Sequence, residues 1–171
     1  MILRRRTLFL ASLAGCTASE PPSGSVAIAP GVTLRLPNAN ELGRSVEAAQ
    51  MVRANYRQQD IVFEGQLSVT PGRLLLACID PLGRPAMTLR WEQGRLSAQT
   101  AEWFPASLRP ENMLADIMLI YWPQASLRSG LGASNATVQD GPHRRMVLSG
   151  PQPIIQIDYM FERSVKRNGA V

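Results

Sequence analysis

The spacing of apolar side chains changes along this chain of 171 residues, and it predicts strands first, then helices, then strands again. From residue 61 to residue 69 apolar and polar positions alternate, which predicts a strand with one buried face. Residues 73–79 are apolar at almost every position, so we expect this strand to be covered on both faces. Shorter runs predict five more strands, over residues 86–91, 95–100, 136–140, 144–149 and 153–159.

Three stretches have a helical period instead. Asn40 is a suitable N-cap for a helix over residues 41–55, although the apolar stripe of that helix is loose. A second helix is predicted over residues 110–122, opened by proline and glutamate, and a short third helix over residues 124–129. The links between successive strands are too short for crossovers, so the strands are expected to pair antiparallel. The predicted fold class is α+β, with one curved antiparallel sheet and helices on one of its faces.

The second predicted helix carries more apolar surface than one core-facing stripe requires. Its methionine and aromatic side chains suit the wall of a cavity, so this helix is a candidate lid over a pocket for an apolar chain. Plain packing in the core explains the same surplus, and both interpretations stay open. The residues predicted to form the cavity or its lid are Leu76, Met87, Trp91, Met113, Ile117, Met118, Tyr121 and Trp122.

The first sixteen residues have the three parts of an export signal. Arginines at residues 4–6 precede a short apolar run, and Leu-Ala-Gly-Cys at residues 13–16 matches the lipobox of bacterial lipoproteins. The apolar run is too short to cross a bilayer as a helix. We therefore expect residues 1–15 to be removed and Cys16 to be acylated, which would anchor the protein in a membrane. The arginines also resemble a twin-arginine export signal.

The sequence after Cys16 predicts one tethered domain at the outer membrane. Residues 16–33 are rich in Ser, Pro, Gly and Ala, which is typical of a flexible tether, and residues 34–171 form the predicted domain. Thr17 stands where an aspartate would signal retention at the inner membrane, so we expect the periplasmic face of the outer membrane.

The basic composition does not indicate a nucleic-acid binder. The chain has 18 Lys and Arg residues against 13 Asp and Glu residues, a net charge of +5. Removal of the signal takes away three arginines and no acid, so the net charge falls to +2. A net charge this small gives little overall attraction to phosphates, so no nucleic-acid partner is expected.

No catalytic, cofactor or metal site is predicted. His143 is the sole histidine, and Cys78 lies in an apolar run without a cysteine partner, so neither a zinc site nor a disulfide framework is assembled. Nucleophile-elbow, dinucleotide-binding and Walker-type motifs are absent from the sequence. Asp116, within an apolar helix, is open to two interpretations: a solvent-facing or arginine-paired acid, which we favour, or a catalytic carboxylate whose pKa burial raises.

Two segments resemble a known family. Ile79-Asp80-Pro81-Leu82-Gly83 and, above all, the run from Asn112 through Leu114-Ala115-Asp116 to Trp122-Pro123 are similar to an uncharacterised family of Gram-negative lipoproteins. This domain-of-unknown-function family is often encoded in gene clusters for aryl polyenes or related fatty-acid-like pigments. The resemblance extends over residues 42–159. It implies a half-open antiparallel barrel like that of LolA and LolB, with helices as a lid over an apolar cavity, and it brings no catalytic residues. Family members usually continue through more strands, so the short polar stretch 161–171 predicts a barrel without its last strands.

These observations give a first hypothesis and two alternatives. The first is a periplasm-facing lipoprotein, expected as a monomer, that binds or transfers an acyl chain, a polyene lipid or the acyl chains of lipoproteins. The second is a structural or adaptor lipoprotein whose core is filled by its own side chains. The third is an accessory acyl-transfer or thioesterase enzyme, for which the sequence offers little support.

Overall fold

The structure, a computed structural model, describes residues 24–56 and 59–159, and ten strands, two α-helices and one 3-10 helix lie within them. All strand pairs in this part of the chain are antiparallel, so the α+β class is confirmed. In chain order the elements are β1 Ser25–Ala29, β2 Val32–Arg35, η1 Ala39–Leu42, β3 Val46–Tyr56, β4 Gln59–Thr70, β5 Arg73–Ile79, β6 Pro85–Glu92, β7 Arg95–Thr100, α1 Pro110–Tyr121, α2 Gln124–Leu131, β8 Ala136–Asp140, β9 Arg144–Ser149 and β10 Gln152–Asp158.

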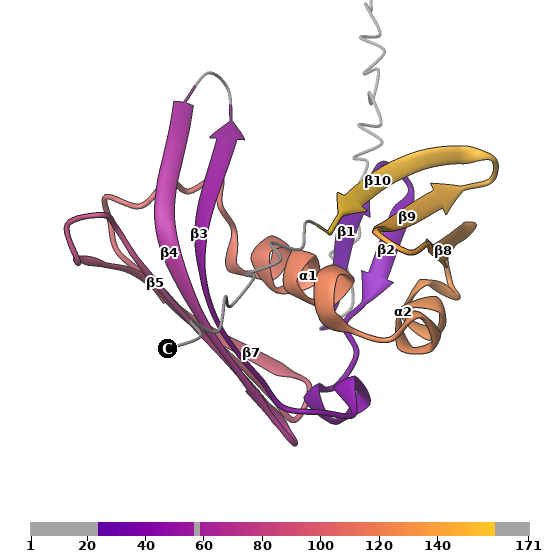
Figure 1. Ribbon diagram of the computed structural model, residues 1–171, viewed down its shortest axis with the longest axis horizontal. Coiled ribbons are helices and arrows are strands. Elements are labelled where there is room, and N and C mark those ends of the chain that lie inside the picture. The colour runs from indigo at the N-terminus through magenta and orange to yellow at the C-terminus, as the bar shows by residue number, and fades with distance from the viewer. Residues whose placement is uncertain (1–23, 57–58, 160–171) are drawn as a thin grey trace, which may run out of the picture.

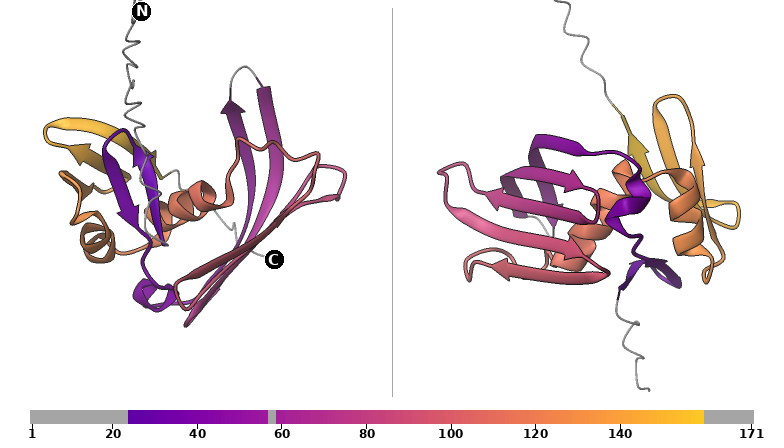
Figure 2. Two further views of the ribbon diagram at one scale, coloured as in Figure 1. Left: turned by 180° about the vertical axis from the view of Figure 1, so that it is seen from behind. Right: turned by 90° about the horizontal axis from the view of Figure 1, so that it is seen from below.

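The expectation of one sheet is wrong, because the described strands form three. A curved sheet has the order β3-β4-β5-β6-β7, a second has β10-β9-β8, and β1 pairs with β2. These strands do not close into a barrel. Helix α1 lies between the five-stranded sheet on one side and the two smaller sheets with α2 on the other (Figure 1), and both views of Figure 2 show the same order.

The five-stranded sheet buries one face through simple alternation. Leu67, Leu76 and Leu89 lie opposite one another on β4, β5 and β6 and are all buried. On β5 the second apolar set, Leu75 and its alternate neighbours, is only half-buried. No described element packs over that outer face (Figures 1 and 2), so the expectation that β5 is covered on both faces is met on the inner face alone.

The prediction of a helix over residues 41–55 is wrong, because most of this stretch, from Val46 onward, belongs to the edge strand β3. Only the short η1 is helical there, and the Glu41 carboxylate accepts a hydrogen bond from the Asn38 backbone N–H (2.8 Å), so Asn38 and not Asn40 precedes it. Strand β3 pairs with β4 along its whole length, from Val46 opposite Val69 to Tyr56 opposite Gln59. Pairing with a strongly alternating strand overrides the helix propensity of the Glu, Ala and Gln residues in β3.

The flexible tether predicted for residues 16–33 is also corrected. Strands β1 and β2 begin at Ser25 and form a hairpin whose side chains Val26, Val32 and Leu34 are buried in the core. The start of the predicted tether, like the predicted signal and Cys16, lies outside the described residues, as does the stretch from residue 160 onward. The folded domain therefore includes the β1–β2 hairpin.

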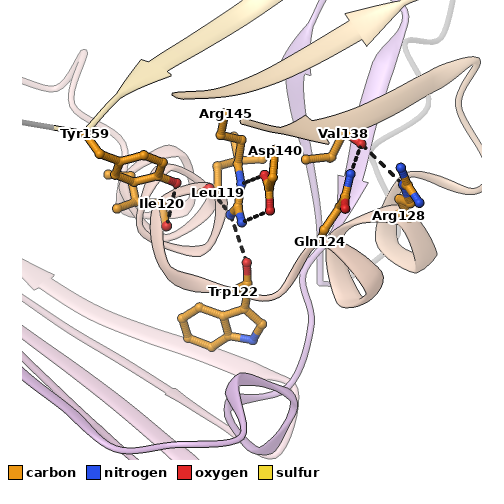
Figure 3. A network of polar contacts seen from close by, with 9 residues as sticks. All are labelled: Leu119, Ile120, Trp122, Gln124, Arg128, Val138, Asp140, Arg145 and Tyr159. Carbon is orange, nitrogen blue, oxygen red and sulfur yellow. Dashed lines mark hydrogen bonds and ion pairs between the residues drawn. The ribbon is translucent and has the colours of Figure 1, made fainter. Parts of the chain in front are cut away.

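Arg145 of β9 fixes the carboxyl end of α1 (Figure 3). Its guanidinium is buried, pairs with Asp140 at 2.6 Å and donates hydrogen bonds to the backbone carbonyls of Leu119 and Trp122. The Tyr159 hydroxyl donates to the carbonyl of Ile120 at 3.1 Å. The last carbonyls of a helix have no partner within the helix, so these side chains complete the end of α1 and hold it against the β8–β10 sheet.

Two indole groups anchor the chain segment between β2 and η1. The N–H of Trp91 on β6 donates to the carbonyl of Pro37, and the N–H of Trp122 donates to the carbonyl of Asn38, both at 3.0 Å. Both indoles are almost completely buried. The bonds satisfy polar groups in the core and tie the five-stranded sheet and α1 to the β1–β2 hairpin.

Candidate functional site

Helix α1 has two apolar stripes, and they face different surroundings. One stripe is fully buried in the core and consists of Leu114, Ala115, Met118, Leu119 and Trp122. The second has the spacing i, i+3, i+4, i+7 and i+8, faces the five-stranded sheet and consists of Met113, Asp116, Ile117, Ile120 and Tyr121. The apolar surplus of this helix therefore has a structural explanation: one stripe forms the core and the other lines a cavity.

The cavity lies between the second stripe of α1 and the inner face of the five-stranded sheet. Its volume is about 190 Å³. Most of its wall is aliphatic or aromatic, and the chain contributes lining residues from β3, β4, β5, α1 and the loop before α1. They are Gln50, Val52, Phe63, Gly65, Leu67, Leu76, Leu108, Met113, Asp116, Ile117, Ile120 and Tyr121. Leu108 belongs to a loop in which Phe104 packs edge-on against Phe63, with ring centroids 5.8 Å apart, so the loop is fixed to the cavity wall.

Gly65 opens space on the inner face of β4. It occupies an inward-facing position between Phe63 and Leu67. The other inward-facing positions from Ile61 to Val69 carry apolar side chains. A Cβ atom placed on Gly65 would meet only ordinary contacts, with Leu76 Cδ1 at 3.5 Å and Val52 Cγ2 at 3.9 Å. Backbone geometry therefore does not require glycine here, and its effect is the missing side chain. In the sequence, the glycine that interrupts the apolar positions of β4 is the signal for this cavity.

Polar groups occur at the edge of the otherwise apolar wall. The Gln50 side-chain amide of β3 donates a hydrogen bond to the hydroxyl of Tyr121, which connects the edge strand to α1 across the cavity. Asp116 is on the same stripe of α1. Its side chain is exposed to solvent on one side and lines the cavity on the other.

The surroundings of Asp116 disfavour the ionised form of its carboxyl group relative to the protonated form. Burial among apolar neighbours raises its pKa above the usual value, and no other contribution opposes the shift. The described residues provide no hydrogen bond or ion pair to this carboxyl. The favoured interpretation is a solvent-facing or arginine-paired acid: Asp116 is exposed to solvent, and no arginine pairs with it in this part of the chain.

The eight residues predicted for the cavity or lid fall into two groups. Leu76, Met113, Ile117 and Tyr121 line this cavity. Met87, Trp91, Met118 and Trp122 are buried in the core and do not line it. Met118 and Trp122 are on the other stripe of α1, and the indole of Trp91 is turned toward Pro37.

The remaining candidate positions do not form a competing site within the described residues. No group of His, Cys, Asp and Glu side chains there could hold a metal ion, and none of the described helices is long and apolar enough to span a bilayer. His143 is exposed in the β8–β9 turn. Cys78 is buried, and burial raises the pKa of its thiol to about 11, far from the range of a reactive cysteine.

A wider groove of about 940 Å³ follows the outer face of the same sheet. Its floor includes short or polar side chains such as Gln66, Ala77 and Thr88, and no described element covers it. The smaller cavity is the better candidate for a ligand, because it is enclosed by two elements and has an apolar wall.

Comparison with known proteins gives one match. A family model described as "Protein of unknown function (DUF3261)" matches residues 47–171, which include the cavity and both helices. No curated protein and no solved structure matches the chain. The match agrees with the expected domain of unknown function, and it does not bear on lipidation or on a likeness to LolA and LolB.

Proposed function

The chain belongs to the DUF3261 family, and we propose that it is a lipoprotein that binds or transfers an apolar chain in the cavity between α1 and the five-stranded sheet. The observation that carries this proposal is a cavity of about 190 Å³ that the protein's own side chains leave unfilled. Protein interiors are packed about as densely as organic crystals, so apolar side chains that face unfilled space make fewer packing contacts than those in the core. An apolar ligand that occupied this space would restore the missing contacts.

The volume suits a segment of a chain rather than a large ring system. It exceeds the roughly 150 Å³ in which an engineered apolar cavity binds benzene, and it is below the roughly 300 to 1,000 Å³ of pockets for drug-sized molecules. The cavity is not closed on all sides, so a longer acyl or polyene chain would place one segment inside and extend beyond the rim.

The cellular setting belongs to the same proposal. Acylation of Cys16 would hold the domain at the outer membrane on its periplasmic side, next to the lipids or lipoproteins that it would bind. The curved sheet with α1 against its inner face is compatible with the half-open barrel of LolA and LolB, and this finer likeness remains part of the proposal. Mass spectrometry of the N-terminal peptide of the mature protein tests the anchor, because an unmodified Cys16 would contradict it.

Lipid extraction of the gently purified full chain tests the ligand. We expect bound acyl or polyene lipid in the native mass spectrum and binding of the apolar fluorophore N-phenyl-1-naphthylamine after the lipid is removed. Gly65→Leu should abolish both, because its side chain would project into the cavity between Val52 and Leu76. Gly65→Ala is the matched control and should retain binding.

One outcome would support the structural or adaptor alternative instead. A folded, lipid-free protein that does not bind the fluorophore would show that the cavity has no ligand. Near-ultraviolet circular dichroism of each variant separates loss of binding from loss of folding.

A further inference from the structure

We infer that the cavity selects amphiphiles whose polar group donates hydrogen bonds and carries no negative charge, and that Asp116 determines this choice. The inference rests on the proposed function, since it concerns the polar end of the chain that the cavity would bind. Three polar side chains reach this cavity, from α1 and from β3: those of Asp116, Tyr121 and Gln50.

The described residues that line the cavity include a negatively charged side chain and no positively charged one. Among the lining residues, all within the described chain, Asp116 supplies a carboxylate and no Lys, Arg or His side chain is present. A fatty-acid carboxylate bound here would lie near a like charge, with no cation among these lining residues to balance it. An amine, alcohol or amide head would instead meet an acceptor.

The hydrogen-bonding capacity of the polar lining residues favours the same class of ligand. An ionised carboxylate is only an acceptor, and the described residues provide no donor to Asp116. Tyr121 already accepts a hydrogen bond from the Gln50 amide. A ligand head that donates would replace the hydrogen bonds that solvent makes to the exposed Asp116 carboxylate, whereas a head that cannot donate would displace that water without replacing its bonds.

The position of Asp116 places this acceptor beside the apolar wall. Asp116 follows Met113 by three residues and precedes Ile120 by four, so all three lie on the stripe of α1 that faces the sheet. A chain lying between this stripe and β4 would bring a terminal polar group within reach of the carboxylate while its methylene groups contact Met113 and Ile117. The ligand class is therefore a single apolar chain with a neutral or cationic donor head.

Competition between matched twelve-carbon compounds tests the inference on the full chain. Each compound is titrated against bound N-phenyl-1-naphthylamine at neutral pH, below its micellar concentration or its solubility limit. We expect dodecylamine and dodecanol to compete at concentrations at least tenfold below that of dodecanoate, with methyl dodecanoate, which cannot donate, in between. In Asp116→Asn dodecanoate should gain affinity at least threefold and dodecylamine should lose it by at least as much.

A charge-matched control separates a local effect from the overall charge of the protein. Glu47→Gln removes one carboxylate from the outer face of β3, on the opposite side of the sheet from the cavity, and should leave the order of the ligands unchanged. The inference is overturned if dodecanoate competes as well as dodecylamine, or if Asp116→Asn and Glu47→Gln have the same effect. If the fluorophore and all four compounds fail to bind, the proposed function fails together with the inference.

Discussion

At the scale of single residues, Asp116 lowers the stability of the protein where it is charged. Its pKa is raised by burial in the folded state, so the unfolded chain ionises more easily. Below the ordinary pKa of an aspartate, about 3.9, both states hold the proton and no penalty exists. As the pH rises through that value toward the folded pKa the penalty develops, and it is complete above the folded pKa.

Asp116→Asn is therefore expected to stabilise the protein at neutral pH and to have little effect below about pH 4. Because the side chain is partly exposed, solvent reduces the gain to less than about 1 kcal/mol. Urea denaturation of both proteins at pH 7 and at pH 3.5 measures the difference. Equal gains at the two pH values would contradict a penalty that comes from the charge.

The cavity shows how far residues could be assigned from spacing. The sequence has a surplus of apolar side chains on α1, and of these Met113, Ile117 and Tyr121 are on the stripe that lines the cavity. Met118 and Trp122 are equally apolar, but the helical period turns them toward the core. Composition alone cannot separate two apolar stripes, because only the packing partners decide which one is covered.

At the scale of elements, the end of α1 depends on Arg145. Arg145→Met should destabilise the protein by about 2–4 kcal/mol, since it leaves the carbonyls of Leu119 and Trp122 and the carboxylate of Asp140 without their buried donor. Arg144→Met is the matched control. Arg144 pairs with Asp158 where both side chains are about half exposed, so its loss should cost less than about 1 kcal/mol.

Thermal unfolding of the two variants checks this prediction. Similar melting temperatures for Arg144→Met and Arg145→Met would show that the buried contacts to α1 do not support the helix.

The elements predicted best were those whose local pattern and tertiary partners agree. The ranges of β5, β7, β8 and β9 match the predictions at both ends. The prediction failed for β3, whose composition favours a helix while its partner β4 imposes extended pairing. It also missed the β1–β2 hairpin, because a small-residue composition resembles a linker when the core that buries Val26 and Leu34 is unknown.

At the scale of the whole molecule, three sheets without shared backbone pairing are joined by one hydrophobic core. Helix α2 packs closely against β2 at Gly130. A Cβ atom there would be 2.5 Å from the backbone oxygen of Arg35 and 2.9 Å from Leu34 Cδ1, both in β2. This contact explains why residue 130 is a glycine inside α2, which continues to Leu131 rather than ending before the glycine as we predicted.

If the core unfolds as one unit, a substitution that disrupts the contact between Gly130 and β2 must also increase the opening of the distant five-stranded sheet. Gly130→Ala should destabilise the protein by about 1–3 kcal/mol, because the backbone of β2 has to move. Cys78 in β5 reports the consequence: it is buried and its thiol has a pKa of about 11, so iodoacetamide reacts with it essentially only after opening. Alkylation should accelerate roughly tenfold for each 1.4 kcal/mol lost.

Gly141→Ala, whose Cβ atom would meet the oxygen of Arg144 at an ordinary 3.5 Å, should leave the rate unchanged. Peptide mass spectrometry of Cys78 gives the rate, and an unaltered rate in a destabilised Gly130→Ala protein would mean that the five-stranded sheet unfolds independently of the β1–β2 hairpin and α2.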